Sequence, residues 1–168
     1  MPKMEVFYDY ECPYCMRGVN YLMKHIDDYP EVTIEWHPVE GHPRPEVHPP
    51  HTDLANQGFH FAVENGVNPT VYNERLFNAL HTDRIDVEDP AALAEYVKDL
   101  VDADAYEKAL RDGTFKDAQE ADNDLAYEAR DVWFIPVFIL GDNRVDAEGG
   151  VGVTEEAVVE LLKKSQNS

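Results

Sequence analysis

Cys12-Pro13-Tyr14-Cys15 is the stretch where residue type and spacing allow covalent chemistry. It holds the only two cysteines among 168 residues, so within the chain each thiol can pair only with the other. Two thiols at this spacing can close into a disulfide and reopen, which is the chemistry of dithiol exchange. The motif follows directly on a strand-like apolar run at residues 4–10.

A helix that begins at this motif would give the two sulfurs different surroundings. Pro13 suits the first helical position, where the missing N–H costs nothing. Cys12 would then lie at the helix N-terminus, whose unpaired N–H groups and dipole stabilise a thiolate. Cys15 begins an apolar stripe with three- and four-residue spacing along 15–26, which predicts that it is buried. We therefore interpret Cys12 as the attacking thiol and Cys15 as the resolving thiol.

Two structural roles compete with this interpretation. A disulfide that closes so small a ring removes little chain entropy and stabilises a fold weakly. A zinc site needs two further Cys or His ligands at suitable spacing. The histidines make such a site conceivable, but the strand directly before the motif favours redox chemistry. We predict no metal bound through these cysteines.

Composition narrows the classes of partner. The chain has 34 acidic and 14 basic residues, a formal net charge of −20. This charge disfavours nucleic acid and anionic membrane surfaces as partners, because both are bound through Lys and Arg. No apolar run of about 20 residues could span a bilayer, and the N-terminus shows no apolar secretion segment. We expect a cytoplasmic protein, in which a lone Cys-x-x-Cys is more often catalytic than structural.

Periodicity predicts an α/β protein of one domain. A strand at 4–10, a helix and a strand at 32–37 imply a parallel pair. An irregular stretch with five prolines covers 38–50. Helices are then expected at 53–66 and 69–81, after the Asp89 cap, after an Asp104 cap, and from Thr114 along a stripe at 118–132. A strand at 134–140, a hairpin partner at 144–146 and a helix capped by Thr154 complete the chain.

Pro136 is unexpected inside the apolar strand 134–140, because proline removes a ladder donor. A proline at strand entry or at a sheet edge is one solution. A cis bond after Ile135 is another, and we favour it. The backbone N–H and C=O of Ile135 would then remain available to pair with an extended substrate chain.

Together these pieces resemble the thioredoxin superfamily, in particular its DsbA-like branch and the FrnE-like cytosolic members. The strand at 7–10 followed by Cys12-Pro13-Tyr14-Cys15 looks like the family's Asp-x-x-Cys-Pro-aromatic-Cys, and 129–138 looks like the approach to its cis-proline. The resemblance covers 1–168 as a single domain with a thioredoxin-like fold. Residues 1–40 and 132–168 would form the core, and about 52–131 a helical insertion between its βαβ and ββα halves.

The resemblance implies a thiol–disulfide oxidoreductase acting on protein or peptide thiols and disulfides. It implies Cys12 as nucleophile, Cys15 as resolving thiol and Pro136 as the cis-proline. No tightly bound cofactor is expected beyond the dithiol itself, and glutathione is a candidate reductant. The alternative is a glutathione-dependent small-molecule isomerase or transferase on the same fold, although such enzymes often carry Ser where Cys12 stands.

Acidic neighbours bear on the redox potential. Asp9 and Glu11 flank Cys12 and oppose a second negative charge, and Tyr14 stands where DsbA-like oxidants often carry His. We predict a protein less oxidising than a periplasmic DsbA, because a stabilised thiolate is what makes an oxidant strong.

Histidines cluster around the proline-rich stretch. His42, His48 and His51 lie in or beside it, with His37 before and His60 after. They could bind a metal or supply a proton. Their irregular spacing matches no regular ligand motif, so we expect an ordinary solvated loop and no metal site.

Overall fold

The structure is a computed structural model that describes residues 2–167. Its strands are β1 (Lys3–Tyr8), β2 (Thr33–Pro38), β3 (Val137–Leu140) and β4 (Asn143–Asp146). Its α-helices are α1 (Pro13–His25), α2 (Asp53–Glu64), α3 (Pro69–His81), α4 (Pro90–Tyr96), α5 (Ala103–Asp112), α6 (Lys116–Asp124) and α7 (Glu155–Lys163). Short 3₁₀ turns follow α1 and α7, and a π-helical turn, Leu125–Ala129, follows α6. In the described part of the chain no helix is long and apolar enough to cross a membrane.

The four strands form one mixed sheet in the order β2-β1-β3-β4. β1 and β2 are parallel, in register from Lys3 opposite Thr33 to Tyr8 opposite Pro38. This confirms the parallel pair predicted from the helical crossover between them. β3 is antiparallel to β1 and forms a hairpin with β4, as predicted. The fold is therefore α/β and thioredoxin-like, with helices inserted between β2 and β3.

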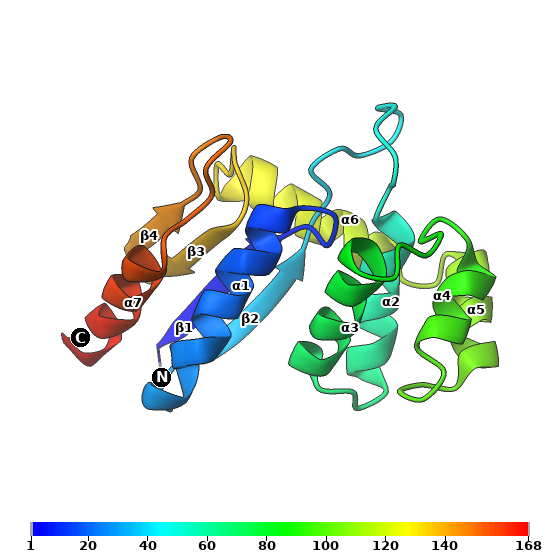
Figure 1. Ribbon diagram of the computed structural model, residues 1–168, viewed down its shortest axis with the longest axis horizontal. Coiled ribbons are helices and arrows are strands. Elements are labelled where there is room, and N and C mark those ends of the chain that lie inside the picture. Colours follow the sequence, from blue (N-terminus) through cyan, green and yellow to red (C-terminus); the bar gives the residue numbers. More distant parts are fainter. Residues whose placement is uncertain (1, 168) are drawn as a thin grey trace.

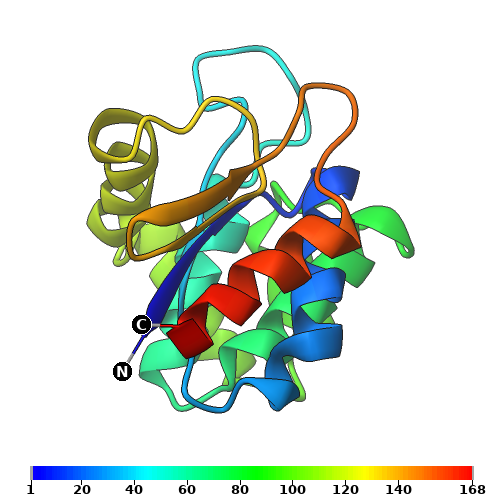
Figure 2. The same cartoon turned by 90° about the vertical axis from the view of Figure 1, so that its left-hand side faces the viewer.

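Helices cover both faces of the sheet. Figures 1 and 2 show α1 and α7 on one face and α6 on the other. Alternate residues of β1 follow this division: Met4, Val6 and Tyr8 belong to the larger apolar core, and Phe7 belongs to a smaller one with Ala126. Because both faces of β1 are buried, its carboxyl end, which leads to Cys12, is firmly held.

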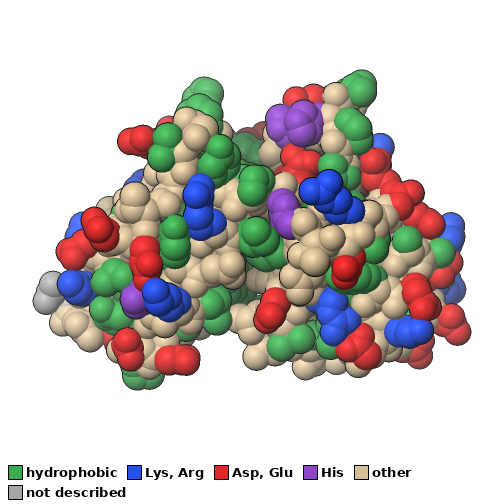
Figure 3. Space-filling view, in the orientation of Figure 1, with side chains coloured by type: hydrophobic (Ala, Val, Ile, Leu, Met, Phe, Trp, Pro, Cys, Tyr) green, Lys and Arg blue, Asp and Glu red, His purple; other side chains and the backbone are tan. Residues whose placement is uncertain are grey.

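The inserted helices α2 to α5 stand beside the β2 edge of the sheet (Figure 1). Two tyrosines, one at the end of β1 and one just after it, connect the inserted helices to the sheet. Tyr8 Oη and Tyr10 Oη donate hydrogen bonds of 2.8 and 2.6 Å to Asn73 Oδ1 of α3. The insertion thus contacts the segment that carries the cysteines. Figure 3 shows the surface hollowed between the strand-bearing half and the helical half.

Helix boundaries in the insertion partly correct the sequence predictions. The helices predicted at 53–66 and 69–81 are present as α2 and α3. Asp104 does not cap α5; Asp102 does, by accepting a 3.1 Å hydrogen bond from the Ala105 N–H. Thr114 does not begin α6, whose N-cap is Phe115 without a side-chain cap.

The stripe predicted along 118–132 is confirmed only in part, because Val132 is buried and Leu125 packs against the smaller apolar core, whereas the alanines do not follow it. Ala121 and Ala129 are exposed, and the buried positions of α6 are instead Gln119 and Asp122. Alanine is small enough to sit on either face of a helix, so an alanine pattern is a weak guide to burial. Two strands are also shorter than predicted, because β1 ends at Tyr8 and β3 begins only after Pro136.

Candidate active site

The first turn of α1 holds both thiols. Cys12 is the N-cap with extended backbone angles (φ −85°, ψ 115°), and Pro13 occupies the first helical position, as predicted. Cys12 Sγ accepts a 3.4 Å hydrogen bond from the Cys15 N–H, which is the contact of a capping side chain. The sulfur of Cys12 therefore faces the unpaired N–H groups of the helix end.

Burial separates the two sulfurs. Cys12 is partly exposed, whereas Cys15 is fully buried in the larger core, and both are free thiols. The Cys15 Sγ accepts a 3.4 Å hydrogen bond from the Asp9 N–H. Burial raises the pKa of the Cys15 thiol well above its ordinary value, and the neighbouring Cys12 adds to this rise. Cys15 is therefore a protonated thiol while Cys12 can ionise.

The pKa of Cys12 is lowered from its ordinary value of 9.0. Hydrogen bonding from the Cys15 side chain is the largest cause, and backbone N–H groups of Cys15 and Tyr14 add to it, while burial and the charge of Asp9 act in the opposite direction. The sequence prediction that Asp9 opposes the thiolate is thus confirmed. The hydrogen bonds from Cys15 and Tyr14 together nevertheless outweigh it and lower the pKa of Cys12.

The Ile135–Pro136 segment lies opposite Cys12. The Cys12 Sγ is 4.0 Å from the Ile135 carbonyl oxygen, and the Ile135–Pro136 peptide bond is cis. Within residues 2–167, no backbone hydrogen bond is made by the Ile135 N–H or C=O. Gly18 allows this approach, since a Cβ there would lie 2.9 Å from Pro136 Cγ. The structure brings together the predicted Cys12, Cys15, Ile135 and Pro136.

Tyr14 connects the motif to the turn before α7. Its hydroxyl donates a 3.1 Å hydrogen bond to the Gly150 carbonyl. Gly152, with φ +85°, lies against the ring, and a Cβ there would be 3.1 Å from Tyr14 Cβ. Only a glycine fits both this backbone angle and this contact.

A cleft of about 660 Å³ opens beside Cys12. Its walls come from segments far apart in sequence: the loop 41–50, the residues before β3 and the turn 148–150. In Figure 1 this loop and this turn rise on either side of the N-terminus of α1. Trp133 and Phe134 line the cleft although they are 79% and 57% exposed. Sequence reasoning assigned neither residue to the site: Phe134 was placed in the predicted strand, and Trp133 was treated only as part of the approach to the cis-proline.

Asp9 has a structural role that the sequence did not predict. It is 1% exposed, and its carboxylate accepts hydrogen bonds from the Gly41 N–H (2.8 Å), the Thr52 hydroxyl (2.9 Å) and the Glu11 N–H (3.1 Å). Burial raises the pKa of Asp9 above its ordinary value, and the three hydrogen-bond donors reduce this rise without reversing it. Asp9 therefore fixes both ends of the loop 41–52 beside the dithiol.

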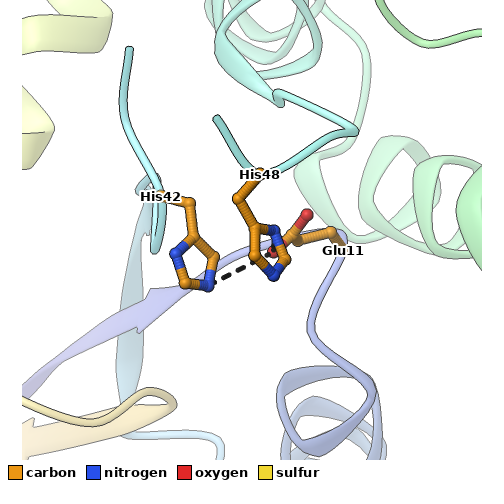
Figure 4. A group of neighbouring side chains, drawn as sticks. All are labelled: Glu11, His42 and His48. Atoms are coloured by element: carbon orange, nitrogen blue, oxygen red, sulfur yellow. Dashed lines mark ion pairs between the residues drawn. The ribbon is translucent and has the colours of Figure 1, made fainter. Parts of the chain in front are cut away.

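Two of the loop histidines meet at the cleft. His42 and His48 stack with ring centroids 3.7 Å apart, and both approach Glu11 (Figure 4). His51 does not join them: its ring bonds Glu88 at 3.0 Å and the Glu46 carbonyl at 2.7 Å. The sequence could not predict this meeting, since the spacing of the three residues follows no regular period.

Comparison with known proteins agrees with this geometry. Residues 3–162 match the model of the DSBA-like thioredoxin domain. The chain belongs to that family. Over 197 aligned residues, this chain is also 28% identical to the uncharacterized protein YwbO of Bacillus subtilis. The alignment covers 96% of this chain and 98% of YwbO.

Solved structures show the same fold at low identity. A probable DsbA oxidoreductase from Streptomyces coelicolor superposes with a TM-score of 0.85 at 17% identity, covering 100% of this DSBA-like chain and 91% of the other. Pseudomonas aeruginosa DsbA gives 0.72 at 20% identity, covering 99% and 84%. A 2-hydroxychromene-2-carboxylate isomerase gives 0.73 at 17% identity, covering 98% and 95%.

Proposed function

We propose that this protein exchanges disulfides with protein or peptide substrates through Cys12 and Cys15. The observation that carries the proposal is the asymmetric pair at the α1 N-terminus: one partly exposed, hydrogen-bonded sulfur with a lowered pKa, and one buried thiol within the same turn. A thiolate attacks, and a protonated neighbour resolves.

The reaction has two balanced steps. The Cys12 thiolate attacks one sulfur of the substrate disulfide, which forms a mixed disulfide and releases the first substrate thiolate. The Cys15 thiol then loses its proton and attacks Cys12 Sγ, which releases the second substrate thiolate and leaves a Cys12–Cys15 disulfide. Two electrons pass from the dithiol to the substrate, and the reverse sequence oxidises a substrate dithiol.

The cleft favours a polypeptide substrate. The backbone groups of Ile135 make no backbone–backbone hydrogen bond within residues 2–167, and the carbonyl oxygen receives a long 4.0 Å contact from Cys12 Sγ. Both groups therefore suit an extended chain that pairs by main-chain hydrogen bonds beside Cys12. The exposed rings of Trp133 and Phe134 supply apolar contact for its side chains.

A small-molecule isomerase is the second candidate, because one structural relative is a 2-hydroxychromene-2-carboxylate isomerase. That likeness concerns the fold. An isomerase of this kind gives no role to the buried Cys15 thiol, and for this reason we rank it below disulfide exchange.

Trapping tests the proposal. Cys15→Ser should accumulate covalent, reductant-sensitive adducts with unfolded or disulfide-bonded proteins, because the mixed disulfide can no longer be resolved. Cys12→Ser should form none and should lose insulin reduction. Adducts with glutathione alone, or insulin reduction that survives Cys12→Ser, would overturn disulfide exchange with proteins.

A further inference from the structure

Glu11, His42 and His48 form a compact group at the mouth of the cleft (Figure 4). Glu11 Oε1 lies 3.6 Å from His48 Nδ1 and 4.0 Å from His42 Nε2. One potential ligand atom from each of the three residues lies within 4.8 Å of the others. The side chains come from two segments, the β1–α1 connection and the loop 41–52, which Asp9 holds together.

A hydrogen-bonding partner orients one histidine of the group, and one carboxylate oxygen of the group has no hydrogen-bond partner within the described residues. His42 Nδ1 is 2.8 Å from Glu46 Oε1, which leaves its Nε2 directed toward Glu11. A carboxylate on the far nitrogen is the usual way in which proteins orient a metal-binding histidine. Glu11 Oε2 is buried and has no hydrogen-bond partner within the described residues. A buried carboxylate oxygen of this kind is costly unless a cation or donor offsets it.

A second group of similar composition, Glu5, Glu35 and His37, serves as a contrast. There the ligand atoms are already engaged: both Glu5 oxygens accept from Arg130 at 2.8 and 3.1 Å, and His37 Nδ1 lies 2.7 Å from Asp122. That group is an ion-pair network of the fold. Its existence shows that proximity alone does not distinguish a binding site from such a network.

We propose that Glu11, His42 and His48 bind a divalent transition-metal ion of the zinc class beside the dithiol. Two imidazoles and one carboxylate are the protein ligands of open zinc sites. Ligands about 2.0 Å from a tetrahedral ion lie about 3.3 Å apart, so small movements of an exposed loop bring these atoms into range. This departs from the sequence expectation of an ordinary solvated loop.

The ion would lie close to the reactive sulfur. Cys12 follows Glu11 directly and lines the same cleft as both histidines. Three protein ligands leave one position of a tetrahedral ion open, and a thiolate is a strong ligand for that position. Metal bound here therefore slows the reactions of Cys12. The site itself does not depend on the proposed redox function.

Calorimetric titration with Zn²⁺ tests the site separately from the cysteines. A Cys12→Ser/Cys15→Ser protein should bind one ion, because its thiols are gone and the ligand set remains. In that background Glu11→Gln and His48→Asn should each weaken binding at least about tenfold, and Glu46→Gln should weaken it by about tenfold through the lost orientation of His42. His25→Asn is the matched control, since His25 pairs with Glu155 at 2.6 Å outside the group. It should leave the affinity unchanged.

No Zn²⁺ binding by the double-serine protein would overturn the proposal, as would equal affinity in Glu11→Gln, His48→Asn and their parent. Co²⁺ gives a second readout that does not depend on those variants. It should give ligand-field absorption in the wild type and in Cys12→Ser, with a thiolate charge-transfer band only in the wild type. Absence of ligand-field absorption in both proteins would also overturn it.

Discussion

Cys12 and Cys15 lie on one helical turn, yet their thiols have opposite environments. The N-cap position exposes one sulfur to backbone donors, and the apolar stripe of α1 buries the other. Both placements follow from the spacing of the motif and from Pro13, which are local properties of the sequence. For this reason the environments of the two thiols could be predicted before the fold was known.

Alkylation of the reduced protein should reflect this difference. With a metal chelator present, the rate at Cys12 should rise with pH and reach half its maximum below the ordinary thiol pKa of 9.0, because its pKa is lowered and the thiolate is the nucleophile. Cys15 should remain unmodified in the folded protein, since its pKa is raised and it is buried. Peptide-resolved mass spectrometry of the wild-type protein separates the two rates, because a substitution of Cys15 would itself change the pKa of Cys12. A Cys12 profile that matches free cysteine would contradict this prediction.

Other residues of the site could not be predicted. Glu11, His42 and His48 meet only because a proline-rich loop folds back onto the α1 N-terminus, and no periodicity describes such a loop. The prediction of a potential below that of periplasmic DsbA stays a prediction. Redox titration against glutathione measures it, and a DsbA-like potential would contradict it.

Among the elements, α6 departs most from its sequence pattern. Its buried face is polar, and Asp122 accepts 2.7 Å hydrogen bonds from both His37 of β2 and His60 of α2. Polar residues on a helix normally indicate the solvent side. Here their partners come from two other elements, which a sequence pattern does not reveal. Element types and order were nevertheless predictable elsewhere, because β1, α1, α4 and α7 carry clear periodicity or caps.

Asp122→Asn should lower the free energy of unfolding most between about pH 4 and 6.5. Burial lowers the pKa of His37, but its hydrogen bonds to Asp122 and Glu35 outweigh burial and raise that pKa overall. The stabilising contribution of His37 is therefore complete below pH 6.5 and is lost as the pH rises through the raised pKa. Burial raises the pKa of Asp122, but its histidine partners lower it overall. The stabilising contribution of Asp122 is therefore present above pH 3.8 and is lost as the pH falls through the lowered pKa.

Within that window the expected loss is about 2–4 kcal/mol, measured by urea unfolding. At pH 9 the loss should be smaller. Asp124→Asn, an exposed position on the same helix, is the control and should change stability by less than about 0.5 kcal/mol. An equal loss at pH 5 and pH 9 would show that the charged network is not the cause.

Across the whole molecule the net charge of −20 is the dominant electrostatic feature. Figure 3 shows acidic side chains on both the strand-bearing and the helical half of one face, rather than in a single patch. Such a distribution favours solubility and opposes compactness through self-repulsion. Exposed ion pairs each contribute no more than about 1 kcal/mol, so they offset little of it.

Raising NaCl from about 0.01 to 1 M should therefore increase the urea midpoint, because the screening length falls from about 30 to 3 Å. An Asp124→Asn/Glu128→Gln variant, changed at two exposed positions, should gain less from the same salt. A midpoint that falls with salt would show that surface ion pairs outweigh repulsion.

Tyr14 and Arg17, one turn apart on α1, both donate hydrogen bonds to the turn 148–152. The Tyr14 hydroxyl bonds the Gly150 carbonyl, and Arg17 Nη2 donates a 3.1 Å hydrogen bond to the Val151 carbonyl. Tyr14 stands between Cys12 and Cys15 in the sequence, so a shift of the first turn of α1 when the two thiols join would also move the side chain that holds this turn. We expect the reduced and oxidised forms to differ in the shape of this wall of the cleft, so that the two forms hold a bound polypeptide with different affinity.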